Sequence, residues 1–125
     1  MTESAVACLV SSDFAATEKF YRCFGFEARP PLGGGLYLRR GTVELMFTAR
    51  AEPLAWDEDR VAMILVEGVA AWRTLFARTR MRWKAMGRPG LTEISSGAWD
   101  GPVFNLSDRD SNLIWVVQQP PAFSA

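Results

Sequence analysis

The sequence predicts an α+β fold built from two tandem β-α-β-β-β modules, whose curved sheets surround a concave cleft. An apolar run at residues 6–11 recurs at residues 61–66, and each copy precedes a segment with apolar residues at helical spacing. Short runs typical of strands follow in both halves, in the same order. The 125 residues, 49% of them apolar, suffice for a single domain. That domain covers residues 1–125, with module 1 at about 5–48, a linker at 49–59 and module 2 at about 60–118.

The first module combines one helix with four strands. Asp13 is a suitable N-cap for the helix, and Gly25 is a suitable stop. Pro30 and Pro31 are expected to end the strand that follows the helix, and Gly41 joins the two strands of a hairpin. The strands are expected at residues 6–11, 26–29, 36–40 and 42–47.

The second module repeats this order after a polar linker that contains Pro53. Apolar residues from Val69 to Thr79 follow helical spacing, and the segment ends among arginines, which suit a helix C-terminus. A polar turn at residues 108–112 separates the last two strands. The strands are expected at residues 61–66, 91–95, 102–106 and 113–118.

The composition excludes several functional classes. The 14 basic residues balance the 14 acidic ones, which removes the usual electrostatic case for nucleic-acid binding. The sequence contains neither a run long enough to span a membrane nor a secretory signal, so a soluble, cytoplasmic protein is expected. Cys8 and Cys23 make neither a disulfide framework nor a zinc cluster. The concave surface that the two modules form is the expected place for a small ligand.

The sequence contains no histidine. This excludes a histidine general base, a Ser–His or Cys–His nucleophile, and every metal site that needs imidazole. The acidic run at residues 57–59 is interpreted as a solvated loop rather than a metal site. We therefore expect no metal, no cofactor and no enzymatic activity.

Two motifs carry a family resemblance. Asp13-Phe14, Phe20-Tyr21 and Phe24-Gly25-Phe26 follow the first strand, and residues 108–113 read DRDSNL where the family has D-P-D-G-N-x. The pair resembles the vicinal-oxygen-chelate superfamily, which contains glyoxalases, bleomycin-resistance proteins and dioxygenases. In its metal-dependent enzymes the first and last strands of each half supply the ligands. The matching positions here are Val6, Glu44, Val61 and Trp115, of which only Glu44 could hold a metal. The resemblance therefore opposes lyase or dioxygenase chemistry.

Further segments resemble the bleomycin-resistance proteins of this superfamily. They are residues 12–14, RGTVELMF at 40–47, LTEI at 91–94 and AWDG at 98–101. The resemblance implies a homodimer without catalytic activity, whose interfacial clefts sequester a flat, cationic glycopeptide antibiotic. It leaves open whether the dimer exchanges its first strand.

Strand alternation indicates which side chains face the cleft. If Val6, Glu44, Val61 and Trp115 point inward, so do Cys8, Met46, Met63 and Val117. The three valines are expected to pack as core, and the two methionines suit either role. A carboxylate at Glu44 that faces the cleft needs a cationic ligand or an internal arginine partner. The candidate ligand-binding residues are Tyr37, Glu44, Met46, Phe47, Trp56, Met63, Trp99, Asp100 and Trp115.

Alternative interpretations remain for several of these features. Trp56 could cover a sheet edge, and Trp72 is expected in the core. The basic segment at residues 73–88 is interpreted as a solvated face, although basic and aromatic residues together also occur in nucleic-acid modules. The main alternative function is binding of another planar drug or metabolite by the same fold, and a less favoured one is a metal-dependent lyase or dioxygenase.

Overall fold

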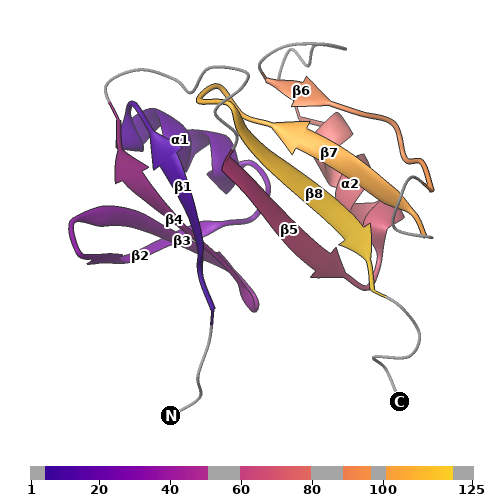
Figure 1. Cartoon of the computed structure of the whole chain (residues 1–125), viewed down its shortest axis with the longest axis horizontal. Helices are drawn as coiled ribbons and strands as arrows, with labels where there is room; N and C mark the ends of the chain where they lie inside the picture. Colours follow the sequence, from indigo (N-terminus) through magenta and orange to yellow (C-terminus); the bar gives the residue numbers. More distant parts are fainter. Residues whose placement is uncertain (1–4, 51–59, 80–88, 97–100, 120–125) are drawn as a thin grey trace.

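The computed structural model describes residues 5–50, 60–79, 89–96 and 101–119, and it confirms the predicted α+β fold with two β-α-β-β-β modules (Figure 1). The first module consists of β1 (Ala7–Ser11), α1 (Phe14–Arg22), β2 (Glu27–Leu32), β3 (Gly35–Arg40) and β4 (Val43–Ala49). The second consists of β5 (Arg60–Val66), α2 (Val69–Ala77), β6 (Gly90–Leu91), β7 (Val103–Ser107) and β8 (Asn112–Gln118).

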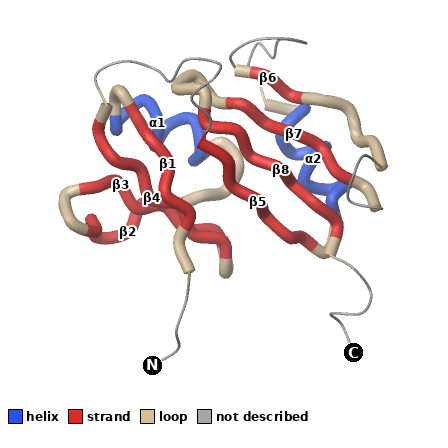
Figure 2. Tube along the Cα trace, in the orientation of Figure 1, coloured by secondary structure: helices blue, strands red, loops and turns tan. Residues whose placement is uncertain are grey.

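The two sheets share one topology. The first has the strand order β1-β4-β3-β2, and the second has the order β5-β8-β7-β6. In each sheet the first strand of the module runs parallel to its last strand, and the remaining pairs are antiparallel. Strands β1 and β5 lie side by side where the modules meet, and the helices lie behind the sheets in this view (Figure 2). Each sheet therefore has one face covered by its helix and one open face.

Local capping explains where the helices begin and end. The Asp13 carboxylate accepts a hydrogen bond from the Ala16 backbone N–H at 3.2 Å, as expected for an N-cap. Gly25 follows α1 with a φ of 88°, a conformation that glycine adopts without strain. Gly68 has no side chain to cap α2, and the Gln118 amide oxygen accepts from the Val69 N–H at 3.1 Å instead. No helix in the described residues is long and apolar enough to cross a membrane.

Two strands differ from the prediction. Strand β2 continues through Pro30 and Pro31 to Leu32, with a register irregularity after Arg29. Because β2 is the last strand in the order of its sheet, the prolines remove no hydrogen bond from a ladder inside the sheet. The strand predicted at residues 91–95 is reduced to Gly90–Leu91 and an isolated bridge between Ser95 and Val103.

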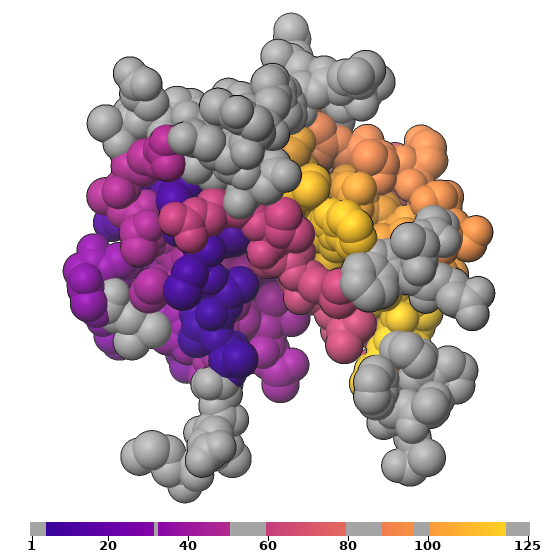
Figure 3. All heavy atoms as spheres, viewed as in Figure 1, coloured from indigo at the N-terminus to yellow at the C-terminus, as the bar shows by residue number. Residues whose placement is uncertain are grey.

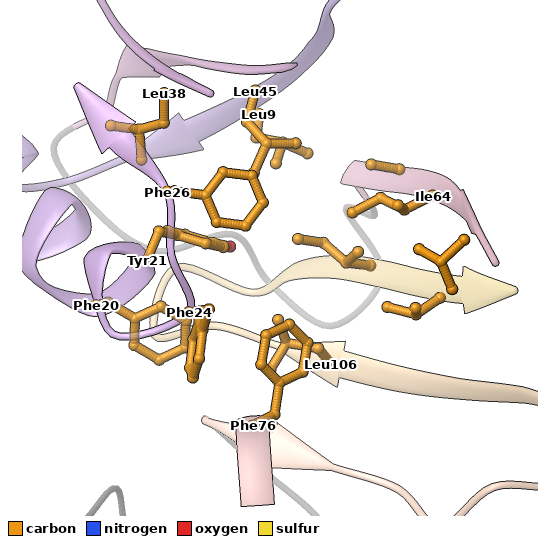
Figure 4. Packing of buried hydrophobic residues seen from close by; sticks show 14 of the residues in the cluster. Leu9, Phe20, Tyr21, Phe24, Phe26, Leu38, Leu45, Ile64, Phe76 and Leu106 are labelled. Carbon is orange, nitrogen blue, oxygen red and sulfur yellow. The ribbon is translucent and has the colours of Figure 1, made fainter. Parts of the chain in front are cut away.

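The covered faces of both sheets and the two helices share one hydrophobic core (Figure 4). Aromatic rings connect the modules: the Phe24 and Phe76 ring centroids are 4.2 Å apart, and Phe76 lies 5.7 Å from Phe104. At the edge of this core the Arg40 guanidinium lies 4.0 Å from the centre of the Trp72 ring. The modules therefore join through buried aromatic contacts as well as through their neighbouring strands.

A polar cluster joins the modules at the carboxyl end of β1. The Asn112 side chain accepts from the Val10 N–H at 3.0 Å and donates to the Val10 carbonyl at 2.7 Å, so it pairs with β1 as a neighbouring strand would. The Asp110 carboxylate accepts from the Ser12 hydroxyl at 2.7 Å. The Tyr21 hydroxyl donates to Asp108 at 2.6 Å. The predicted turn at residues 108–112 thus attaches the second module to the first.

The Asp108 carboxylate is the centre of this cluster. It accepts hydrogen bonds from Tyr21, from the Asn112 side chain and from the backbone N–H groups of Asp110 and Asn112. Burial nevertheless raises the pKa of Asp108, because the loss of hydration outweighs the hydrogen bonds that favour its ionised form. Burial and the neighbouring carboxylate raise the pKa of Tyr21 well above its usual value. The hydroxyl therefore stays a hydrogen-bond donor throughout the neutral pH range.

Candidate ligand-binding groove

Alternation along the strands separates the core from the open faces. In β4, Leu45 and Phe47 are buried in the core, and Glu44 and Met46 lie on the opposite face. In β5, the core positions alternate with exposed ones in the same way. The open faces of the two sheets are therefore the places where side chains remain available to a ligand.

The open face of the first sheet is polar. The Tyr37 hydroxyl on β3 donates a hydrogen bond to the Glu44 carboxylate on β4. Arg39 Nε lies 4.0 Å from the same carboxylate oxygen, and the Glu44 side chain is only 8% exposed. The hydrogen bond to Glu44 is the main cause of a raised pKa of Tyr37. Glu44 thus has the internal arginine partner that the sequence allowed as one of two possibilities.

The open face of the second sheet is apolar. Val61, Met63 and Leu65 succeed one another along β5 and are 54%, 44% and 48% exposed. Trp115 on β8 is paired with Met63 in the register of the sheet and is half-buried. A row of three exposed apolar side chains on one strand is a feature that commonly marks a binding surface.

A groove of about 390 Å³ connects the two faces where the modules meet. Its walls come from the start of β1, the start of β4 and the second half of β5. Glu44 from the first module and Met63 from the second both line it. In the space-filling view, atoms of β1 and β5 adjoin one another at the surface (Figure 3). One groove within a single chain therefore combines a carboxylate with apolar side chains.

The structure separates the sequence-predicted site residues into four groups. Tyr37, Glu44 and Met46 share the open face of the first sheet, and Met63 and Trp115 share that of the second. Phe47 is fully buried in the core, because its neighbour Met46 faces the other way, and so it does not join them. The remaining three candidates, Trp56, Trp99 and Asp100, lie outside the described residues.

The three valines that were predicted to pack in the core differ in their burial. Val117 is buried, as expected, and Val6 is half-buried. Val61 is 54% exposed, so the expectation that it packs as core is wrong. Val61 shares the open face of β5 with Met63 and Leu65, opposite the residues that pack in the core, and this explains its exposure.

Two contributors to the open faces were missed in the sequence. Arg39 lies beside Glu44, and Leu65 extends the apolar row of β5. Strand alternation contains the signal for both, since Arg39 is two residues after Tyr37 and Leu65 is two residues after Met63.

Comparison with solved structures identifies the same architecture elsewhere. A bleomycin-binding protein complexed with bleomycin matches with a TM-score of 0.85 and 24% identity, over 95% of this chain and 100% of that one. The bleomycin resistance determinant encoded on the transposon Tn5 matches with a TM-score of 0.84 and 24% identity, over 94% and 98% of the chains. A bleomycin-binding protein from Streptomyces verticillus, complexed with copper(II)-bleomycin, matches with a TM-score of 0.79 and 20% identity, over 96% and 98%.

The chain has the fold of the bleomycin-binding proteins. No protein-family model and no curated protein matches its sequence. The coverage of nearly the whole length of both partners means that the bleomycin-binding fold accounts for both modules and for the way they are joined. It is the fold that the two sequence motifs predicted.

The residues of this chain do not fit the metal site that the family resemblance ascribes to metal-dependent enzymes. Of the four positions that match the enzymes' ligands, Val6, Val61 and Trp115 offer no suitable donor atom, and Glu44 alone cannot satisfy a divalent ion. In the described part of the chain, no three His, Cys, Asp or Glu side chains lie close enough together to hold a metal.

Proposed function

We propose that this chain is a metal-free binding protein that sequesters a bleomycin-type glycopeptide antibiotic and so confers resistance without catalysis. The observation that carries the proposal is the groove, which Glu44 lines together with Met63 and Leu65 from the apolar row of β5. An apolar, thioether-containing wall suits a flat ring system, and a carboxylate suits a positive charge. The fold, shared with proteins crystallised with bleomycin, supports the same assignment.

The proposal includes a homodimer with its clefts at the interface. Val61, Met63 and Leu65 form a row of exposed apolar side chains, and a second copy together with the ligand would cover it. Trp56, Trp99, Asp100 and Trp115 are the proposed stacking and rim residues of this cleft. Light scattering coupled to size-exclusion chromatography measures the mass directly, and a monomer with and without ligand would contradict this part.

Calorimetric titration with metal-free bleomycin tests the binding function. We expect a dissociation constant in the micromolar range or below, which corresponds to about −8 kcal/mol or more favourable. Met63→Gln should weaken binding by about tenfold, because it places a polar group on the apolar wall. Trp99→Ala and Glu44→Gln should also weaken it.

Ala70→Gln is the control for these variants. It introduces the same polar side chain at an exposed position of α2, away from the open faces, and should leave the affinity unchanged. Absence of binding at high micromolar bleomycin would contradict the proposal for this antibiotic.

A second candidate is binding of another planar drug or metabolite in the same groove. The contact between Arg39 and Glu44 supports this second candidate, because a carboxylate that already has an internal arginine partner does not need a cationic ligand. A panel of planar compounds, monitored by quenching of tryptophan fluorescence, distinguishes the two. A compound that binds at least about tenfold more tightly than bleomycin would identify the second function.

A further inference from the structure

Three charged side chains form a row across the open face of the first sheet. In the register of the sheet, Arg39 on β3 is opposite Glu27 on β2 and opposite Glu44 on β4. Side chains directly opposite one another on the same face of an antiparallel pair lie within reach of each other. The row therefore offers two carboxylates to one guanidinium.

Arg39 lies between two cavities. Glu44 lines the groove, and Arg39 lines a neighbouring hollow of about 180 Å³ together with Glu27, Arg29 and Gly41. Its Nε donates to the Gly41 carbonyl at 3.0 Å and lies 4.0 Å from the Glu44 carboxylate, at the limit of an ion pair. The Arg39 side chain is 43% exposed, and an ion pair with so exposed a partner contributes little free energy. A cation that enters the groove can therefore displace it.

We propose that Arg39 is an internal competitor for the ligand. It lies against Glu44 in the unliganded protein, and it turns toward Glu27 when a positively charged group of the ligand takes its place. The hydrogen bond from Tyr37 holds the Glu44 carboxylate in position in both states. This inference rests on the proposed binding function of the groove, and it narrows the ligand to an apolar body that carries a positive charge.

Two fluorescent probes of opposite charge test the competition in the full chain. Ethidium is a planar cation, and anilinonaphthalene sulfonate is an apolar anion. Removal of the competitor by Arg39→Ala should strengthen ethidium binding by about threefold and leave binding of the anion unchanged or weaker. Glu44→Gln should weaken ethidium binding by about tenfold. In the Glu44→Gln background, Arg39→Ala should no longer strengthen it.

Glu27→Gln tests the second position of the guanidinium. Loss of this carboxylate should weaken ethidium binding by about twofold, because the displaced Arg39 loses its alternative partner. The effect should vanish in the Arg39→Ala background. Glu67→Gln is the matched control, since it removes one negative charge at an exposed position between β5 and α2, and should change nothing.

The outcomes separate this inference from the proposed antibiotic. If metal-free bleomycin does not bind but ethidium follows the expected pattern, bleomycin is not the ligand, and the role of Arg39 as a competitor is supported. If Arg39→Ala weakens ethidium binding or leaves it unchanged, Arg39 does not compete. If the wild-type chain does not bind ethidium at all, the groove does not accept an apolar cation and the inference is overturned.

Discussion

The two ends of the junction between the modules differ in chemistry. At the carboxyl end of β1, the turn at residues 108–112 fills the junction with hydrogen-bonded polar groups, nearly all of them buried. At the amino end of β1, the modules leave a groove lined mainly by apolar residues, with Glu44 and Thr42 as its polar ones. A single strand of five residues thus has a closed end and an open end.

This difference indicates which residues stabilise the fold and which are available to bind a ligand. Buried polar groups with partners are costly to disturb, because removal of one partner leaves the other without hydration. Exposed apolar side chains contribute little to stability and are available to a ligand. We therefore expect substitutions at the closed end to change the free energy of unfolding, and substitutions at the open end to change affinity.

Asn112→Ala is the change with the largest expected effect. It leaves the Val10 N–H and carbonyl without their partner and removes one donor from the buried Asp108 carboxylate. The free energy of unfolding should fall by about 3–4 kcal/mol, measured by urea denaturation at pH 7.

Two further variants test whether the closed end contributes more to stability than other positions. Asn105→Ala removes the same side chain from a half-buried position of β7 and should cost less than about 1 kcal/mol. Met63→Ala at the open end should also cost less than about 1 kcal/mol. If Met63→Ala lowered stability as much as Asn112→Ala, the contrast between the two ends would not hold.

Tyr21→Phe has a smaller effect that depends on pH. Loss of the hydroxyl that donates to Asp108 should lower the free energy of unfolding by about 1–2 kcal/mol at pH 7. Tyr21 has a raised pKa in the folded state, so its contribution is complete below the unfolded pKa of about 10 and is lost as the pH rises toward the folded pKa. The difference between wild type and variant should therefore shrink above about pH 10.

Tyr37→Phe is the matched control at the open face. Tyr37 also has a raised pKa, but its hydroxyl is accessible to solvent and its contribution to stability is screened. Denaturation between pH 7 and 11 should show a steep alkaline loss of stability in wild type and in Tyr37→Phe, and a shallower loss in Tyr21→Phe. Equal slopes in all three proteins would show that Tyr21 does not couple folding to pH.

The fold was predictable because its signals are local. Hydrophobic periodicity and capping residues such as Asp13 and Gly25 act within a few positions of themselves, and the repeat supplied the order of apolar runs twice. Strand alternation alone predicted that the Glu44 and Met63 side chains point away from the core. The assignment of Phe47 to the site failed for the same reason, since a residue next to Met46 in a strand must face the core.

At the closed end, the sequence predicted the turn at residues 108–112 but not its contacts. The pairing of Asn112 with Val10 joins residues 102 positions apart, and it depends on how the two modules dock. Nothing in the local sequence specifies a side-chain amide as the partner of a strand. The ion pair of Arg39 with Glu44 similarly depends on the register between β3 and β4.

Ser111→Gly tests the one defect in the closed end and has the smallest expected effect. Ser111 has a φ of 66°, a left-handed conformation that glycine adopts more readily than serine, and its buried hydroxyl has no hydrogen-bond partner among the described residues. Replacement by glycine removes both penalties and adds chain entropy to the unfolded state. The free energy of unfolding should rise by about 0.5–1 kcal/mol, with unchanged affinity for bleomycin. A fall in stability would mean that the Ser111 side chain contributes to the cluster, and that the closed end is better satisfied than its hydrogen bonds indicate.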